Sequence, residues 1–395
     1  MPPDTLNAVR TRPWTLILVV GFALFMDYLI YGAAMPLMEH APGSSAGEQH
    51  LGLLATAYAV GVLGATPLFG WLCERNGCRG PMIEGVLLAG LATVLFMVAP
   101  DFPVVLLARL GQGMASAAVW IAGLALIAEH YSGRRVEMMG YALMGSTGGA
   151  VLGPLLGGWL YEASGYTLPF LVLLVLIAIA AVLCILLLRD SQASASKSPG
   201  LLTILSDRSV AVPAVAVALA AAGWGVLEPL LPVHLARLGE TDAADIGLLF
   251  AAATIVYGAS APFVSWLTER IGVRWTIVLG MLGMAATLPL ICVSDAFGFI
   301  LLALCLVGVS FALLLNPTAA ELGDAVERRG LVCYAAVYSV YNIAYCVGML
   351  GTASVAASIA AHLGFFHTLL LVSFLLLLCV PAMVLATRPA GEAVA

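Results

Sequence analysis

The stretch "GWLCERNGCR" at residues 70–79 is written again, with few changes, as "WLTERIGVR" at 266–274. Aligning Trp71 with Trp266 gives an offset of 266 − 71 = 195 residues. Further matches at this offset include Pro67 with Pro262 and the tripeptide GLL, at 52–54 with 247–249. One insertion between these matches would break the offset, so the two halves of the chain follow the same plan.

The composition is typical of a protein embedded in a membrane. Of the 395 residues, 62% are hydrophobic and 10% are charged, whereas a soluble domain is about a quarter charged. Apolar runs of about 20 residues, the length that a helix needs to cross a bilayer core, recur along the chain. Helices are expected because backbone groups inside lipid must be paired within their own segment. Twelve spans are predicted, near 14–38, 51–73, 80–99, 103–128, 136–160, 167–188, 210–235, 246–268, 275–294, 297–320, 331–360 and 364–387.

The duplication and the spans together predict the domain organisation. The polar stretch "SQASASKSPG" at 191–200 separates the sixth and seventh spans and reads as a linker. We predict an all-α membrane protein with twelve transmembrane helices in two pseudo-symmetric six-helix bundles. The bundles are the halves 1–190 and 210–395, joined by a cytoplasmic linker at 191–209. Such a plan is typical of transporters that bind substrate near the membrane midplane.

The positive charges predict the orientation. Fourteen of the sixteen Lys and Arg lie at the termini or in loops that follow an even-numbered span. Only Arg237 lies in an odd-numbered loop, and Arg109 lies inside a span. By the positive-inside bias, both termini and the even-numbered loops are cytoplasmic. The alanine-rich composition and the absence of an organelle-targeting tail favour a bacterial cytoplasmic (inner) membrane.

Three ionisable residues fall well inside predicted spans, namely Asp27, Arg109 and Glu228. Each costs about 2.5–3.5 kcal/mol on insertion scales and normally faces a cavity or a partner. Burial favours the protonated form of a carboxyl, and a nearby arginine favours the ionised form. A carboxyl that alternates between these surroundings binds and releases a proton, and a cation that competes for it couples the two fluxes. The alternative is a fixed ion pair that only holds helices together.

Aromatic and amide side chains near these spans are candidates for substrate contact. Aromatic faces suit organic cations, and they suit helix packing equally well. The candidates are Tyr31, Tyr257, Tyr341 and Asn342.

The duplicated stretch itself predicts a conformational role. It falls in the cytoplasmic loop after the second helix of each half, where a glycine permits a tight turn and charges can pair with helix ends. The alternative is an ordinary solvated loop whose arginines set topology. We predict a latch made of Gly70, Glu74, Arg75, Gly77 and Arg79 in the first half and Glu269, Arg270, Gly272 and Arg274 in the second.

These residues also carry a family resemblance. "GWLCERNGCR" resembles the loop signature of the major facilitator superfamily, with Glu74 where aspartate is usual, and "RLGQGMASAA" (109–118) resembles its Arg-x-x-Gln-Gly signature. The glycines of the fifth span resemble the antiporter signature of drug:proton exchangers. Their packing needs no substrate, and we expect Gly149, Gly153 and Pro154 to act as a hinge or seal.

A closer resemblance covers most of the chain, to the vesicular monoamine and acetylcholine transporters and their bacterial relatives. It is carried by "FMDYLIYGAAMPL" (25–37), "LEPLLPVHL" (227–235), "GPLLGGWLYEASGYTLPFLVL" (153–173) and "SVYNIAYCVG" (339–348). The resemblance implies that Asp27 and Glu228 occupy functional acidic positions and that Tyr257 matches a tyrosine. The chain departs from the family at Ala312 and Asn342, which fall on acidic positions, and at Tyr58, which falls on a lysine position.

Together these patterns predict a proton-coupled antiporter that exports an amphipathic organic cation or drug-like molecule by alternating access. An exporter of an anionic or zwitterionic metabolite, such as a siderophore, is the alternative, because two acids are lost and Arg109 is retained. We expect a small-molecule substrate, protons and the lipid bilayer as partners, no nucleic acid, and a monomer. No phosphate-binding loop, cysteine–histidine metal pattern or nucleophile–base set is present in the sequence, so we expect no cofactor, no metal and no enzyme activity.

Overall fold

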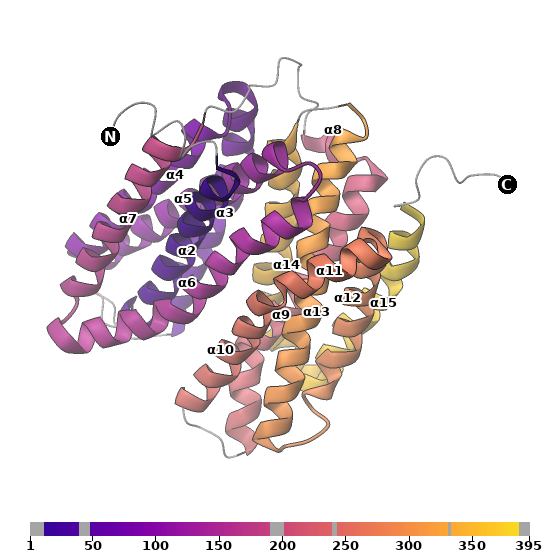
Figure 1. Cartoon of the computed structure of the whole chain (residues 1–395). Coiled ribbons are helices and arrows are strands. Elements are labelled where there is room, and N and C mark those ends of the chain that lie inside the picture. Colours follow the sequence, from indigo (N-terminus) through magenta and orange to yellow (C-terminus); the bar gives the residue numbers. More distant parts are fainter. Residues whose placement is uncertain (1–11, 39–47, 190–200, 239–242, 331–332, 387–395) are drawn as a thin grey trace. The chain divides into compact units, whose positions relative to one another are not determined.

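A computed structural model of the chain describes residues 12–38, 48–189, 201–238, 243–330 and 333–386 (Figure 1). The elements within these ranges are helices. They are α2 (Pro13–Met38), α3 (Glu48–Asn76), α4 (Arg79–Val98), α5 (Phe102–His130), α6 (Arg135–Ser164), α7 (Thr167–Leu187), α8 (Leu201–Leu205), α9 (Arg208–Leu238), α10 (Ala243–Ala259), α11 (Ala261–Ile271), α12 (Val273–Leu290), α13 (Phe297–Glu327), α14 (Tyr334–Leu363) and α15 (Phe365–Ala386).

The helices confirm the prediction of an all-helical membrane protein. Each of the twelve predicted spans coincides with a long helix, the span at 246–268 with the pair α10 and α11, which meet at a bend of 45°. Among the described residues, nine helices are long and apolar enough to cross a membrane, or ten if the bent pair is one span. The predicted linker stretch 191–200 and both chain ends lie outside the described residues.

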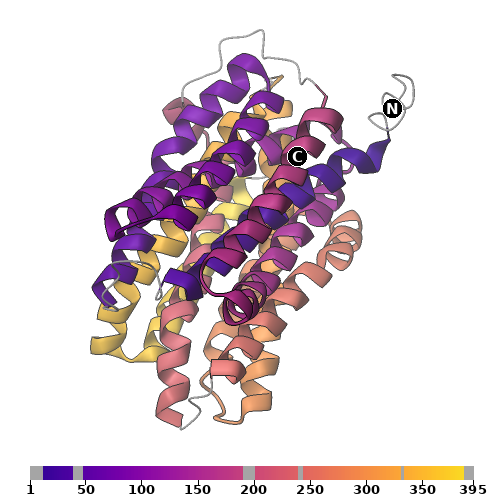
Figure 2. The ribbon, with the colours of Figure 1, turned by 90° about the vertical axis from the view of Figure 1, so that its left-hand side faces the viewer.

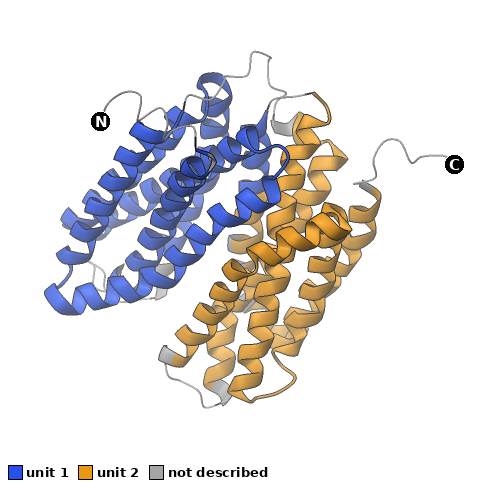
Figure 3. Ribbon diagram, in the orientation of Figure 1, with its two compact units in different colours: residues 1–198, 331–342 blue, residues 199–330, 343–395 orange. Residues whose placement is uncertain are grey.

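The chain divides into two compact units (Figure 3). Unit 1 comprises residues 1–198 and 331–342, and unit 2 comprises 199–330 and 343–395. The first turns of α14 therefore group with unit 1, although the duplicated sequence places them in the second half. Residues 333–342, the described part of this segment, are called the docking segment below.

In unit 1, α2 packs mainly on α6, while α3 and α4 both pack on α5. These helices, coloured indigo to magenta, run alongside one another in Figure 2. Four glycines spaced four residues apart line the α6 face that meets α2, namely Gly145, Gly149, Gly153 and Gly157. At Gly149 a Cβ atom would collide with the backbone oxygen of Phe25, and at Gly157 it would lie 2.8 Å from Cα of Ala33. The α2–α6 contact therefore depends on the absence of side chains at these positions.

In unit 2, α12 packs on α13 and α15, α9 packs on α15 and α13, and α10 packs on α13. Glycine again permits close packing, here of α14 on α9. A Cβ atom at Gly348 of α14 would collide with the backbone oxygen of Ala218 on α9. The helix α9 continues through Pro229 and Pro232 as a single element.

Candidate functional site

A carboxylate in the interior of unit 1 is held by only one of its oxygens. Asp27 lies on α2 and is 6% exposed. Its Oδ2 atom accepts hydrogen bonds from Ser116 Oγ at 2.8 Å and from Trp120 Nε1 at 3.0 Å. Among the residues that the structure describes, none donates a hydrogen bond to its other oxygen, Oδ1. Asp27 is therefore positioned by α5 and keeps one oxygen for another donor.

The helix α5 supplies most of this site on one face. Asp101 caps its first turn by accepting from the backbone N–H of Val104, and Pro103 lies in that turn, where its missing N–H costs nothing. From this start, Arg109, Gln112 and Ser116 are buried and follow one another at intervals of three and four residues. This spacing places the three side chains on one face of α5.

Arg109 is fully buried and forms no ion pair with Asp27 in the described part of the chain. Its Nη1 donates to Gln112 Oε1 at 2.6 Å. Its guanidinium carbon lies 4.7 Å from the ring centre of Tyr31 and 5.0 Å from that of Tyr58. The charges of Asp27 and Arg109 still interact electrostatically. An amide oxygen and two ring faces, and not a carboxylate, are therefore the contacts of this cation.

Tyr58 connects the two charges. Its ring covers Arg109 while its hydroxyl donates to Ser116 Oγ at 3.0 Å, and Ser116 donates in turn to Asp27. The helix α3, which carries Tyr58, packs closely against α5. Gly113 permits this approach, since a Cβ atom there would collide with the backbone oxygen of Tyr58. The sequence marked Tyr58 only as a departure from the resembling family. Its contact with Ser116 depends on how α3 and α5 pack, which no local pattern reveals.

An aromatic shell surrounds the carboxylate. The ring of Tyr28 lies 5.8 Å from that of Trp120 and 6.4 Å from that of Tyr31, and the rings of Tyr31 and Tyr58 are 5.0 Å apart. Each of these rings is half-buried. The predicted site residues Asp27, Arg109 and Tyr31 are therefore brought together.

The other predicted substrate residues lie elsewhere. In unit 2, the half-buried Tyr257 donates its hydroxyl to Asn316 Oδ1 at 3.4 Å, and Glu228 is exposed on α9. In the docking segment, Tyr341 is buried and Asn342 donates Nδ2 to Thr66 Oγ1 at 2.8 Å. The side chain of Asn342 therefore forms a buried hydrogen bond with α3.

The first repeat loop (residues 71–79) is engaged with other parts of unit 1. Glu74 Oε1 accepts the backbone N–H of Ala336, in the first turn of α14, at 3.1 Å. Arg79 Nη2 donates to the backbone oxygen of Ile185 near the end of α7, at 2.9 Å. An acid at a helix start and a cation at a helix end both match the helix dipole. At Gly70, directly before the loop, a side chain would collide with Ser339 Oγ of the docking segment.

More contacts hold the docking segment to unit 1. Arg135 is 2% exposed, its Nε donates to the backbone oxygen of Ala128, and its Nη2 donates to Tyr334 Oη, both at 2.9 Å. One turn further along α14, Tyr338 Oη lies 3.8 Å from Met139 Sδ. Burial and the nearby carboxylate of Glu74 raise the pKa of the Cys333 thiol to about 12.

The second repeat loop (residues 266–274) has a different environment in unit 2. Arg270 lies over the ring of Trp266 at 4.6 Å, and Arg274 lies over the ring of Trp275 at 5.0 Å. Within the described part of the chain, Glu269 has no hydrogen bond or ion pair, and it is exposed. Gly272 has a φ of +85° and Gly77 of the first loop a φ of +82°, so both copies make the turn that glycine permits.

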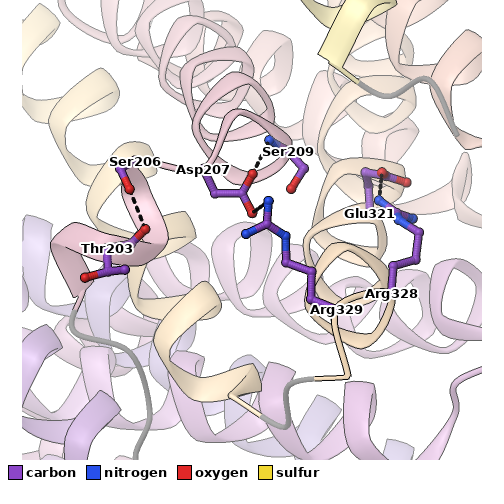
Figure 4. Close-up of polar contacts among 7 residues, drawn as sticks. All are labelled: Thr203, Ser206, Asp207, Ser209, Glu321, Arg328 and Arg329. Atoms are coloured by element: carbon purple, nitrogen blue, oxygen red, sulfur yellow. Dashed lines mark hydrogen bonds and ion pairs between the residues drawn. The ribbon is translucent and has the colours of Figure 1, made fainter. Parts of the chain in front are cut away.

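Ion pairs also fix the end of α13, directly before the docking segment (Figure 4). Arg329 reaches Asp207 at 2.6 Å, and Arg328 reaches Glu321 at 2.6 Å. Asp207 also accepts the backbone N–H of Ser209 at the start of α9, at 3.0 Å. These contacts tie the end of α13 to the start of α9 within unit 2.

The cysteines are all free thiols. All eight cysteines lie within the described residues, and none is in a disulfide. No group of three or more His, Cys, Asp or Glu that could hold a metal ion occurs among the residues that the structure describes.

Comparison with solved structures supports the fold. The human organic anion transporter MFSD10 superposes with a TM-score of 0.80 over 94% of this chain and 100% of its own, at 17% identity. The fucose:proton symporter FucP of E. coli superposes with a TM-score of 0.77 over 96% of this chain and 100% of its own, at 14% identity. At such identities the likeness concerns the fold alone.

Sequence relatives point to one group of transporters. The chain is 30% identical over 322 residues to the synaptic vesicular amine transporter of Rattus norvegicus, covering 80% of this chain and 62% of the relative. It is 29% identical over 350 residues to the human protein of that name, covering 87% and 68%. It is 26% identical over 393 residues to a probable vesicular acetylcholine transporter of Danio rerio, covering 94% and 78%. This chain therefore spans about three fifths of the length of the rat relative.

A family model decides the classification. The model of the Major Facilitator Superfamily matches residues 17–211 and 213–395, which together are nearly the whole chain. This confirms the predictions of an integral membrane transporter for a small-molecule substrate and of a protein that is not an enzyme. The chain belongs to the Major Facilitator Superfamily and is a secondary transporter related to the vesicular amine and acetylcholine transporters.

Proposed function

We propose that this protein is a proton-coupled antiporter that exports an amphipathic organic cation, and that Asp27 binds the proton and the cation in turn. The observation that carries the proposal is the half-satisfied carboxylate. Oδ2 of Asp27 is held by Ser116 and Trp120, while Oδ1 has no donor among the described residues. A buried anion of this kind is costly unless a proton or a cation neutralises it.

The surroundings of Asp27 fit an organic cation. The rings of Tyr28, Tyr31 and Trp120 lie close to one another on α2 and α5. Aromatic faces attract cations and also cover apolar substituents, so an amine with an aromatic or aliphatic body would be bound at both ends. The printed name of the rat relative, an amine transporter, agrees with this chemistry.

Exchange follows from competition at one carboxyl. A protonated Asp27 releases its proton when a cation approaches Oδ1, because the cation stabilises the ionised form. Arg109 limits how tightly the cation is held, since its positive charge repels it from nearby. When the site opens to the other side of the membrane, a proton displaces the cation and the cycle repeats.

The repeat loops would control access. We propose that Glu74, with Gly70, Arg75, Gly77 and Arg79, latches the docking segment. Glu269, Arg270, Gly272 and Arg274 would form the counterpart in unit 2. Gly149, Gly153 and Pro154, on the α6 face against α2, would form the hinge or seal on the substrate side. We further propose cytoplasmic termini, a bacterial inner membrane and a monomer, on the distribution of charge and the composition alone.

The test is uptake by proteoliposomes with an imposed pH gradient. A panel of fluorescent organic cations is compared with citrate-type anions, for the wild type, Asp27→Asn and Glu228→Gln. We expect gradient-driven accumulation of cations that Asp27→Asn abolishes. Cation uptake by the Asp27→Asn variant at the wild-type rate would refute the proposal, and Glu228→Gln reports whether the second acid contributes to proton coupling.

A second candidate function is export of an anion or zwitterion, and one observation favours it. Nε and Nη2 of Arg109 and Nε2 of Gln112 have no acceptor in the described part of the chain. Nε and Nη2 form the edge of a guanidinium that binds both oxygens of a carboxylate. Arg134 uses this edge on Glu137, with two bonds of 2.7 Å. Accumulation of anions that Arg109→Lys weakens, and Asp27→Asn does not, would establish this candidate instead.

A further inference from the structure

The second repeat loop carries exposed aromatic rings and cations in close association. Trp266 is 47% exposed and Trp275 49% exposed, and Phe263 stacks on Trp266 at 5.9 Å. The guanidinium carbons of Arg270 and Arg274 lie over the rings of these tryptophans. The cluster spans the turn at which α11 ends and α12 begins.

The two cations have no acid partner in the described part of the chain. Arg270 and Arg274 form no ion pair with any residue that the structure describes, although Glu269 is adjacent in sequence. The Nε atom of Arg274 is buried and has no acceptor there either. A ring face leaves the N–H groups at the edge of a guanidinium available, so two cations next to exposed rings can still donate to an oxyanion.

The place of the cluster at the end of a membrane helix decides its partner. Tryptophan is enriched at the level of lipid headgroups, where one edge of the ring is apolar and the other is wet. The positive-inside distribution puts this loop at the cytoplasmic leaflet, which carries the anionic lipids. A lipid phosphate would satisfy the arginines while its acyl chains cover the rings of Phe263 and Trp266.

We propose that Arg270, Arg274, Trp266 and Trp275 form a binding site for the headgroup of an anionic phospholipid. The first repeat loop is the internal contrast. There Arg75 also lies over an exposed ring, Trp71, at 5.2 Å, but Arg79 is committed to the backbone oxygen of Ile185. The first loop therefore has one arginine over a ring that can bind a phosphate, whereas the second loop has two. The proposal does not depend on which substrate the transporter carries.

The experiment measures which lipid stays bound. The purified full-length protein is reconstituted in vesicles of phosphatidylcholine and phosphatidylglycerol at a ratio of 4:1, extracted into mild detergent, and examined by native mass spectrometry. We expect the wild type to retain phosphatidylglycerol well above its bulk share. The double variant Arg270→Gln/Arg274→Gln should lose about fivefold of this preference for each arginine removed.

Two controls keep the result interpretable. Arg75→Gln changes the equivalent position of the first loop and should keep most of the preference. Arg270→Lys/Arg274→Lys keeps both charges, so it should retain phosphatidylglycerol even if the glutamine variant unfolds. The proposal is overturned if the wild type shows no preference, if the folded glutamine variant keeps it, or if the lysine variant loses it. It is also overturned if millimolar inorganic phosphate replaces the lipid, because the site would then bind free phosphate.

Discussion

The two repeat loops have nearly the same sequence and very different surroundings. Glu74 caps the first turn of α14 and Arg79 donates to the end of α7, whereas Glu269 is exposed and Arg274 lies over a ring. The difference does not come from the loops. It comes from the neighbours of the first loop, because the docking segment presents the backbone N–H of Ala336 to Glu74 and the end of α7 presents the backbone oxygen of Ile185 to Arg79. Duplication therefore supplies two equal charge clusters, and the neighbouring helix decides which one is engaged.

The same contrast extends to the interior of the units. At the offset of 195 residues, the position of Arg109 corresponds to Leu304, which is fully buried on α13. Unit 1 has a buried carboxylate, a buried cation and the tyrosines between them. The comparable polar contact of unit 2 is neutral, between Tyr257 and Asn316. At these corresponding positions, a charged group in unit 1 is matched by an apolar residue in unit 2.

The largest effect is expected from making unit 1 resemble unit 2. Arg109→Met removes the cation that Tyr31 and Tyr58 surround and leaves Asp27 without a nearby positive charge. Asp27 then lies buried without the positive charge that interacts with it, and we expect transport to fall by about 30-fold, the factor that about 2 kcal/mol of lost transition-state stabilisation corresponds to. Uptake by proteoliposomes measures this. The matched change Leu304→Met in unit 2 should reduce transport little, since such swaps cost less than about 1.5 kcal/mol.

A smaller effect is expected at the glycine face of α6. Gly149→Ala places a methyl group against the backbone oxygen of Phe25, which cannot move without shifting α2. Such overpacking costs about 1–3 kcal/mol, and thermal unfolding in detergent should report a lower Tm. Gly158→Ala is the control, because no atom lies within 4 Å of the added methyl group. Equal Tm values for the two variants would contradict a tight α2–α6 contact.

The smallest effect is expected from the latch. Glu74→Gln weakens the cap on α14, which is worth about 1 kcal/mol, while Glu269→Gln removes no contact. Without the Glu74 charge the pKa of Cys333 falls from its raised value of about 12, and the thiol gains access to reagents. Maleimide labelling of Cys333 at pH 8, followed by mass spectrometry, should accelerate in Glu74→Gln by about fivefold, the factor that about 1 kcal/mol corresponds to. Equal rates in the two variants would remove the distinction between the loops.

Sequence patterns predicted the spans and the buried charges Asp27 and Arg109, because an ionisable residue in an apolar run is conspicuous, whereas the third predicted residue, Glu228, is exposed on α9. They also predicted that both repeat loops turn at a glycine. They did not predict that Ser116 and Tyr58 hold Asp27 and cover Arg109, since these contacts depend on the packing of α2, α3 and α5.

Nor could the sequence predict that the first turns of α14 group with unit 1. Residues Tyr334, Tyr338 and Asn342 recur every four positions and contact Arg135, Met139 and Thr66. The spacing of this stripe is visible in the sequence. Its partners, about 200 residues away or more, are not.

The most direct test of the shared carboxylate is proton release on cation binding. Purified protein in weakly buffered detergent solution is titrated with tetraphenylphosphonium, and the pH change is recorded beside the heat of binding. If Asp27 exchanges a proton for the cation, the wild type releases about one proton per bound cation, and Asp27→Asn releases none. Cation binding without proton release, or release that persists in Asp27→Asn, would contradict the account.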